Sequence, residues 1–195
     1  MVPPLSPARA RNAAATRAAI LDAARKRFAR EGYDQTGVRE IAADAGVDAA
    51  LISRYFGGKE ELFAEVLSCA PSINELLAEG REGFGERLAH MLAVEPMRDD
   101  KLELILIMLR SASSPKTAEA VRQHSGASFF GPLETFMGGE NAAVRARLLG
   151  CLMLGATMNR MMHEDFMLDD EQRRELCVEL ARTIDHYVSG DVCEG

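Results

Sequence analysis

The chain has 195 residues, of which 47% are hydrophobic and 27% are charged. This composition excludes an intrinsically disordered chain, and the length is sufficient to bury the core of one or two domains. The net charge of −7 would argue against a nucleic-acid-binding protein if it were evenly spread, but residues 1–60 carry ten Lys and Arg against seven Asp and Glu. That segment is therefore +3 and the other 135 residues are −10, which fits a protein with one end on DNA, although chance could also produce the asymmetry.

The sequence predicts a cytoplasmic protein without membrane contact. Its four cysteines form no CxxC pair, no secretory signal is evident, and the longest apolar run, Leu104–Leu109, is too short to span a bilayer.

The first fifteen residues are Pro-rich, then basic and Ala-rich, so we expect a disordered basic arm. Arg9 and Arg11 of this arm could either contact DNA or be solvated. A first helix is predicted from Thr16 to Glu31, because apolar residues recur there at helical spacing and Gly32 is a suitable residue to end it. Much of its remaining surface is expected to be basic, with Arg25, Lys26, Arg27 and Arg30.

Residues 38–59, VREIAADAGVDAALISRYFGGK, contain the pattern that organises the chain. Apolar residues at helical spacing predict a short helix up to Ala45, and Asp48 is a good N-cap for a second one. Gly46 suits the tight turn between them, because a left-handed backbone costs glycine little. Two short helices joined in this way are typical of a helix-turn-helix.

This stretch and its flanks resemble the TetR-type transcriptional regulators, from Thr16 to about Leu67: ILDAARKRFAREGYDQTGVREIAADAGVDAALISRYFGGKEELF. The resemblance implies an all-α fold, with a three-helix DNA-binding head joined to a dimerising bundle of about five or six helices. We expect the basic arm at 1–15, the head at 16–58, and a ligand-binding and dimerisation domain at 59–195.

The expected DNA-binding residues are Thr36, Arg39, Ala49, Ala50, Ser53, Arg54, Tyr55 and Lys59. The resemblance implies phosphate contacts for Thr36, Tyr55 and Lys59, and Thr36 could also cap the second helix. The family commonly has Tyr at position 53, where this chain has Ser. Because the first turn of the recognition helix offers no Arg, Asn or Gln, we expect base readout to depend on Arg39, Ser53 and Arg54. We expect Asp48 to act as a cap rather than as a reader of cytosine.

The middle of the chain is predicted to be helical and to enclose a pocket for an apolar or amphipathic ligand. The almost wholly apolar segment 101–111 could be a buried strand, but no partner strand is evident, so a buried helix is favoured. Gly126, Gly131 and Pro132 are expected to break the helical pattern. The pocket candidates, which core packing would explain equally well, are Met91, Met108, Phe129, Phe130, Phe136, Met137 and Met153.

Two long final helices are predicted at 141–163 and 169–188, the second with a capping box formed by Asp169 and Gln172. Each has more apolar side chains than a single chain could bury, which favours a four-helix dimer interface. The family uses its last two helices in this way. The interface candidates are Leu152, Gly155, Asn159, Leu176, Leu180 and Ile184.

An enzyme is the rival class, but the sequence has no GxGxxG, P-loop or GxSxG motif, and its four histidines are far apart. A pure interaction protein, with the helix-turn-helix as a packing element, is a further alternative. The favoured expectation is a homodimeric repressor that binds a palindromic operator and is released by a small molecule, with no cofactor, no metal and no catalytic residues.

Overall fold

The computed structural model describes residues 7–69, 73–97, 99–112 and 114–190. Every regular element in these ranges is helical, which confirms the predicted all-α fold. None of these helices is both long and apolar enough to cross a membrane. The chain forms two compact units, one made of Met1–Pro71 with Arg98–His124 and the other of Ser72–Met97 with Ser125–Gly195.

Unit 1 begins with α1 (Pro7–Glu31), α2 (Val38–Asp44), α3 (Ala50–Phe56) and α4 (Lys59–Ser68). Their apolar faces meet in one core, whose fully buried members include Ile20, Phe28, Ile41, Ile52 and Phe63. Phe28, Tyr33 and Phe63 pack as an aromatic cluster in which each ring centroid lies 5.2–6.0 Å from the next. This core fixes the positions of the three short helices around the long α1.

The first helix begins at Pro7 rather than at the predicted Thr16. Proline is favoured in the first turn of a helix, and the Ala-rich residues that follow are strong helix formers, so the helix extends into the predicted arm. Residues 1–6, the remainder of that arm, lie outside the described ranges.

Unit 1 also contains α7 (Asp99–Ser111) and α8 (Ala118–Ser125). The helix predicted at 101–111 is present as α7, which packs along α1, but it is only partly buried: Ile107 is part of the same core, whereas Leu109 is 45% exposed. Unit 1 therefore extends beyond the predicted head, because a helix from the middle of the sequence completes its core.

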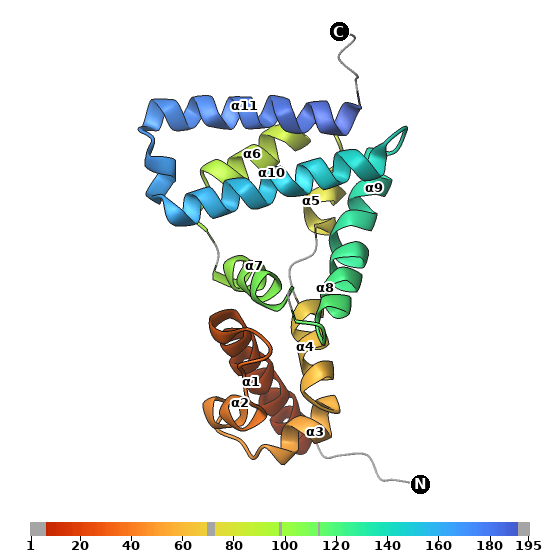
Figure 1. The fold of residues 1–195 in the computed structure, drawn as a ribbon, viewed down its shortest axis with the longest axis vertical. Helices are drawn as coiled ribbons and strands as arrows, with labels where there is room; N and C mark the ends of the chain where they lie inside the picture. The colour runs from red at the N-terminus through yellow and green to blue at the C-terminus, as the bar shows by residue number, and fades with distance from the viewer. Residues whose placement is uncertain (1–6, 70–72, 98, 113, 191–195) are drawn as a thin grey trace. The chain divides into compact units, whose positions relative to one another are not determined.

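Unit 2 contains α5 (Asn74–Ala78), α6 (Phe84–Ala93), a π-helical turn η1 (Gly126–Phe130), α9 (Gly131–Met137), α10 (Ala142–Met162), the 3₁₀ turn η2 (Glu164–Met167) and α11 (Asp170–Ser189). α11 runs beside α10 and packs on α6 (Figure 1). A Cβ on Gly85 of α6 would lie 2.6 Å from the carbonyl oxygen of Ala181, so this close packing requires glycine. The predicted capping box is confirmed, because Asp169 accepts from the amide of Gln172 at 2.9 Å and Gln172 accepts from the amide of Asp169 at 3.2 Å.

The predicted break at Gly126–Pro132 is wrong, because the backbone is helical from Ala118 to Met137. Pro132 lies at the start of α9, directly after the π-helical turn, so its missing amide falls where the hydrogen-bond pattern of the helix changes. The π-helical turn at Gly126–Phe130 accommodates the change between α8 and α9.

Candidate nucleic-acid interface

The helix-turn-helix is formed as predicted, by α2, a turn over residues 45–49, and α3. Gly46 has φ of +66°, the left-handed conformation that the turn requires. The turn is attached to α2 by backbone bonds, among them Val47 N to Ala42 O at 2.9 Å and Gly46 N to Ala43 O at 3.1 Å. These bonds hold the turn against α2, and α3 begins directly after this turn.

α3 divides its residues between the core and solvent as a recognition helix would. Ile52 and Phe56 are buried, whereas Ala50, Ser53 and Arg54 are exposed. Ala49 is half-buried at the start of the helix. The exposed face is therefore made of small side chains that allow close approach, followed by one arginine.

Asp48 is not the N-cap itself, because the N-cap of α3 is Ala49, but its side chain still serves the start of the helix. Its Oδ1 accepts from the amide of Ala50 at 2.7 Å, which satisfies one of the free N–H groups at the start of α3. The carboxylate is thus committed to the backbone, and the alternative of a cytosine reader has no support in the structure.

Arg39 of α2 and Arg54 of α3 are the two exposed arginines of the helix-turn-helix. Within the described ranges, neither forms an ion pair with a carboxylate. Such side chains present a free guanidinium to solvent, where it can donate to phosphate or to a guanine edge.

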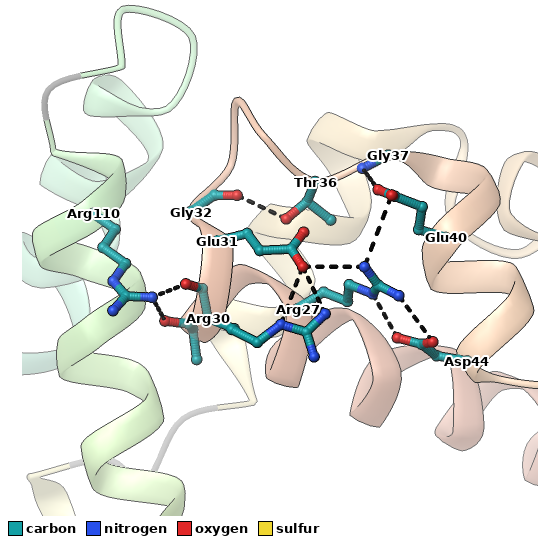
Figure 2. Close-up of polar contacts among 10 residues, drawn as sticks. Arg27, Arg30, Glu31, Gly32, Thr36, Gly37, Glu40, Asp44 and Arg110 are labelled. Atoms are coloured by element: carbon teal, nitrogen blue, oxygen red, sulfur yellow. Dashed lines mark hydrogen bonds and ion pairs between the residues drawn. The ribbon is translucent and has the colours of Figure 1, made fainter.

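Thr36 is placed differently from its predicted contact with DNA phosphate. It is only 2% exposed, and its hydroxyl donates to the carbonyl oxygen of Gly32 at 2.7 Å (Figure 2). It does not cap α2 either, because Gly37 is the N-cap and donates its amide to Glu40 Oε2 at 2.9 Å. The hydroxyl instead closes the turn between α1 and α2, where solvent does not reach it.

Lys59 is the first residue of α4, as the phosphate-binding prediction requires. Its Nζ lies over the ring of Tyr33, 4.1 Å from the centroid, in a cation–π contact. Burial lowers the pKa of the Lys59 ammonium, the charge of Asp34 opposes this, and the charge of Lys116 adds to the lowering. Tyr55 is half-buried and packs against the core of unit 1, and the phosphate contacts of both residues remain predictions.

The basic surface expected on the first helix is largely neutralised by acidic side chains of the same unit. Lys26 and Arg25 both pair with Asp22 at 2.8 Å, and Arg30 pairs with Glu31 at 2.6 Å. Arg27 forms a two-pronged bond with Asp44, Nε to Oδ2 at 2.5 Å and Nη2 to Oδ1 at 3.0 Å. The sequence signal for the pairs with Asp22 was a spacing of three or four residues, and Arg30 and Glu31 are adjacent in the sequence. Nothing local pointed to Asp44.

The predicted ligand-pocket residues divide between the two units. Met108 packs against the core of unit 1, whereas the others lie in unit 2, where Met137 is a fully buried core residue. Phe129 and Phe130 meet edge to face at 4.9 Å, and Phe136 packs on Phe84 at 4.9 Å. Half-buried side chains of this set that pack against the unit 2 core are Met91, Phe129, Phe130, Phe136 and Met153.

A surface groove of about 730 Å³ lies between α5, α6 and α11. It includes Met91 but no other predicted pocket residue, and charged side chains form much of its rim. In the described part of the chain, no three His, Cys, Asp or Glu side chains gather closely enough to hold a metal ion.

The predicted interface residues divide between two environments. Leu180 and Ile184 are buried in the core of unit 2, on the side of α11 that packs on α6, so their assignment to a dimer interface is wrong. Leu152 and Leu176 also pack, half-buried, against this core. Gly155 and Asn159 are exposed on α10. The same helix carries large exposed apolar side chains that the prediction did not name: Val144, Leu148, Leu154 and Met162.

Two family descriptions match the chain. Residues 20–66 match "Bacterial regulatory proteins, tetR family", and residues 82–188 match "Tetracyclin repressor-like, C-terminal domain". The second match covers more than half of the chain, and the first contains α2, α3 and most of α4.

Among characterised relatives, the chain is 47% identical over 58 residues to the HTH-type transcriptional repressor SCO4008 of Streptomyces coelicolor, covering 30% of each chain. It is 37% identical over 93 residues to the HTH-type transcriptional dual regulator CecR of Shigella flexneri, covering 47% of this chain and 40% of that protein. The chain thus spans less than half the length of these relatives. The fold is similar to NalD, the secondary repressor of the MexAB-OprM multidrug efflux pump in Pseudomonas aeruginosa, with a TM-score of 0.65 and 21% identity over 86% of this chain and 94% of that one.

Proposed function

Because the chain belongs to the TetR family of bacterial regulatory proteins, we propose that it is a repressor that binds a palindromic operator as a homodimer and is released by a small molecule. The observation that carries this proposal is the helix-turn-helix itself. Its recognition helix presents small exposed residues to solvent, with Arg54 at its end and Arg39 on the preceding helix, and neither arginine is paired with a carboxylate in the described ranges.

On DNA, α3 would enter the major groove with Ala49 and Ala50 leading, because small side chains let the backbone approach the bases and contact thymine methyl groups. Ser53 and Arg54 would donate to base edges, and Arg39 would contact a base or a phosphate at the groove wall. Lys59 and Tyr55 would bind the phosphate backbone on the flank. Thr36 is left out of this set because its hydroxyl is buried and donates to Gly32.

A homodimer is supported by the exposed apolar face of α10. Val144, Leu148, Leu154 and Met162 lie on it with exposed fractions from 39% to 70%. Gly155, on the same helix, has no heavy atom within 4 Å of where a Cβ would lie, so another helix could approach it closely. A two-fold dimer through α10 would join two recognition helices into one palindrome-reading unit.

Release by a small molecule is supported by the family and by the composition of unit 2. Its half-buried aromatic and methionine side chains suit an apolar or amphipathic effector. Such a molecule can shift the protein away from DNA only by as much as it prefers the non-binding conformer.

The proposal is tested by mixing the purified protein with fragmented genomic DNA of its source at moderate salt, then sequencing the retained fragments. We expect an enriched palindrome. The same selection with Arg54→Ala should lose this enrichment, whereas Arg182→Ala, which removes an exposed arginine of α11, should keep it. Equal retention of all sequences by the unaltered protein would reject the repressor function and favour a helix-turn-helix that serves only in packing.

A further inference from the structure

Arg27 is the least exposed cation of the basic cluster on α1, with only 17% of its side chain accessible. Its guanidinium lies between three carboxylates, Glu31 of its own helix and Glu40 and Asp44 of α2 (Figure 2). A side chain held in this way cannot reach a DNA phosphate without breaking these contacts. Its charge therefore acts within the protein.

The two partners on α2 lie at opposite ends of that helix. Glu40 is in the first turn and lies 3.9 Å from Arg27 Nη1, whereas Asp44 is the last helical residue and binds through both of its oxygens. Contacts at both ends of a helix restrict its direction and its rotation, whereas a contact at one end restricts neither of them fully. Asp44 is also unfavourably placed for the helix dipole, since carboxylates destabilise a C-terminal turn unless a cation compensates them.

Apolar packing alone specifies the position of α2 poorly. The helix has seven residues, and only Ile41 and Ala42 are buried. The residues that follow are bonded to its last carbonyls, through Ala45 N to Ile41 O at 3.0 Å and Val47 N to Ala42 O at 2.9 Å. Any rotation of α2 is therefore passed on to α3.

The C-terminal end of α1, from which Arg27 extends, is itself held by a contact with α7. Arg110 of α7 donates to the carbonyl oxygens of Ala29, at 2.7 Å, and of Arg30 (Figure 2). Glu31 accepts from Arg27 at 3.1 Å and so restricts where the guanidinium can lie. Arg27 thus extends from a fixed helix end toward a helix that would otherwise be loosely held.

We propose that the bridge from Arg27 to Glu40 and Asp44, the Arg27 bridge, is a positioning device that holds α2 and hence the recognition helix at the angle needed for sequence-specific readout. This rests on the proposed DNA-binding function and deepens it. Arg27 makes no contact with DNA, and its loss weakens specific binding through the placement of α3.

The decisive variant is Asp44→Asn. If charge alone mattered, removing a carboxylate from a DNA-binding head would tighten binding to every duplex. If the Arg27 bridge positions α3, Asp44→Asn instead binds the operator recovered in the genomic selection about tenfold more weakly, which is the equivalent of one lost base contact. The variant does not bind a scrambled duplex more weakly. Glu119→Gln, which removes an exposed carboxylate of the same unit that pairs with Arg122 of its own helix α8, is the matched control.

Arg27→Lys is the second variant, because lysine keeps the charge but cannot form the two-pronged bond. We expect a similar loss of operator affinity, with a slope of log K against log salt equal to that of the unaltered protein. Loss of a residue that contacts phosphate would lower the slope by about two, about one for each protomer of the dimer. Arg30→Lys, a more exposed arginine of the same helix, serves as the control.

Both variants are first checked for cooperative thermal unfolding above the assay temperature. If Asp44→Asn is unfolded, Arg27→Lys decides the question. Operator affinity at or above that of the unaltered protein in the folded variants overturns the bridge, and so does a reduced salt slope for Arg27→Lys. If Arg54→Ala still abolishes enrichment in that case, the DNA-binding function stands without the bridge. An unaltered protein that enriches no duplex overturns both proposals.

Discussion

Several carboxyl groups of unit 1 are held below their usual pKa by neighbouring cations. The hydrogen bond from Lys26 lowers the pKa of Asp22, that from Arg30 lowers the pKa of Glu31, and that from Arg27 lowers the pKa of Asp44. A carboxyl group whose pKa is lower in the folded protein than in the unfolded chain stabilises the fold above the unfolded pKa. This stabilisation is lost as the pH falls through the folded pKa.

We therefore predict that the unfolding temperature falls as the pH is lowered from 7 toward 3, and that Asp44→Asn makes this fall shallower. The variant already lacks the stabilisation that ionised Asp44 contributes at neutral pH, so its free energy of unfolding falls less as the pH is lowered. Thermal unfolding followed by circular dichroism across this pH range would measure the effect. Parallel curves for the variant and the unaltered protein would mean that the ion pair between Arg27 and Asp44 does not persist in solution.

Lys59 and Arg54 should fail in different ways when replaced. Lys59→Ala removes a proposed phosphate contact from each protomer of the dimer, so we predict weaker binding to all duplexes and a salt slope lowered by about two. Arg54→Ala should instead remove the sequence preference, because about 1–3 kcal/mol of discrimination is lost at the affected base pair in each of the two half-sites. Titrations of operator and scrambled duplexes at several salt concentrations would separate the two. A Lys59→Ala variant with an unchanged slope would assign this lysine to packing on Tyr33 alone.

At the scale of whole elements, four arginines hold the C-terminal ends of helices distant in sequence. Arg81 donates to carbonyls at the end of α9, Arg110 to the end of α1, Arg145 to the end of α11 and Arg160 to the end of α6. The last carbonyls of a helix have no partner within it, and a cation there also complements the helix dipole. The C-terminal ends of these four helices are therefore held by arginine side chains from other parts of the fold.

Arg145 offers the clearest test, because it donates to Tyr187 at 2.8 Å and also contacts Gly138 and Glu140. We predict that Arg145→Ala lowers the free energy of unfolding by about 1–2 kcal/mol, since several acceptors lose a charged donor while part of the site remains open to water. Urea denaturation would measure this, with Arg182→Ala as a surface control. A change equal to that of the control would show that water replaces these bonds at no cost.

Whether a feature could be predicted from the sequence depended on how far apart in the chain its contacting residues lie. The helix-turn-helix, the turn at Gly46 and the Asp169 cap depend on neighbours within a few residues, and all were predicted correctly. The bond from Arg27 to Asp44 and the burial of Thr36 depend on how separate helices meet, so local patterns gave no sign of them. The apolar seam of α11 fitted a core or an interface equally well, and Leu180 and Ile184 proved to face α6 of the same protomer.

At the scale of the whole molecule, the proposed palindrome readout requires two heads in one particle. Each head of a dimer raises the effective concentration of the other at its half-site, so operator affinity depends on the dimer even though all the proposed DNA contacts lie in unit 1. The exposed α10 face is the surface available for this, and Leu148, 46% exposed, is one of its large apolar residues. A charge at this position would be desolvated in a helix-to-helix interface but solvated in a monomer.

We predict that Leu148→Glu converts a dimer into a folded monomer and reduces operator binding to the level of a scrambled duplex. Leu109→Glu, at an equally accessible apolar position on α7, should remain dimeric, because it lies outside the α10 face. Sedimentation velocity at micromolar concentration would report the mass, and a duplex holding a single half-site would report whether each head still binds. A dimeric Leu148→Glu protein would move the interface away from this face. A monomer that still bound the full palindrome with undiminished affinity would show that the two heads read DNA independently.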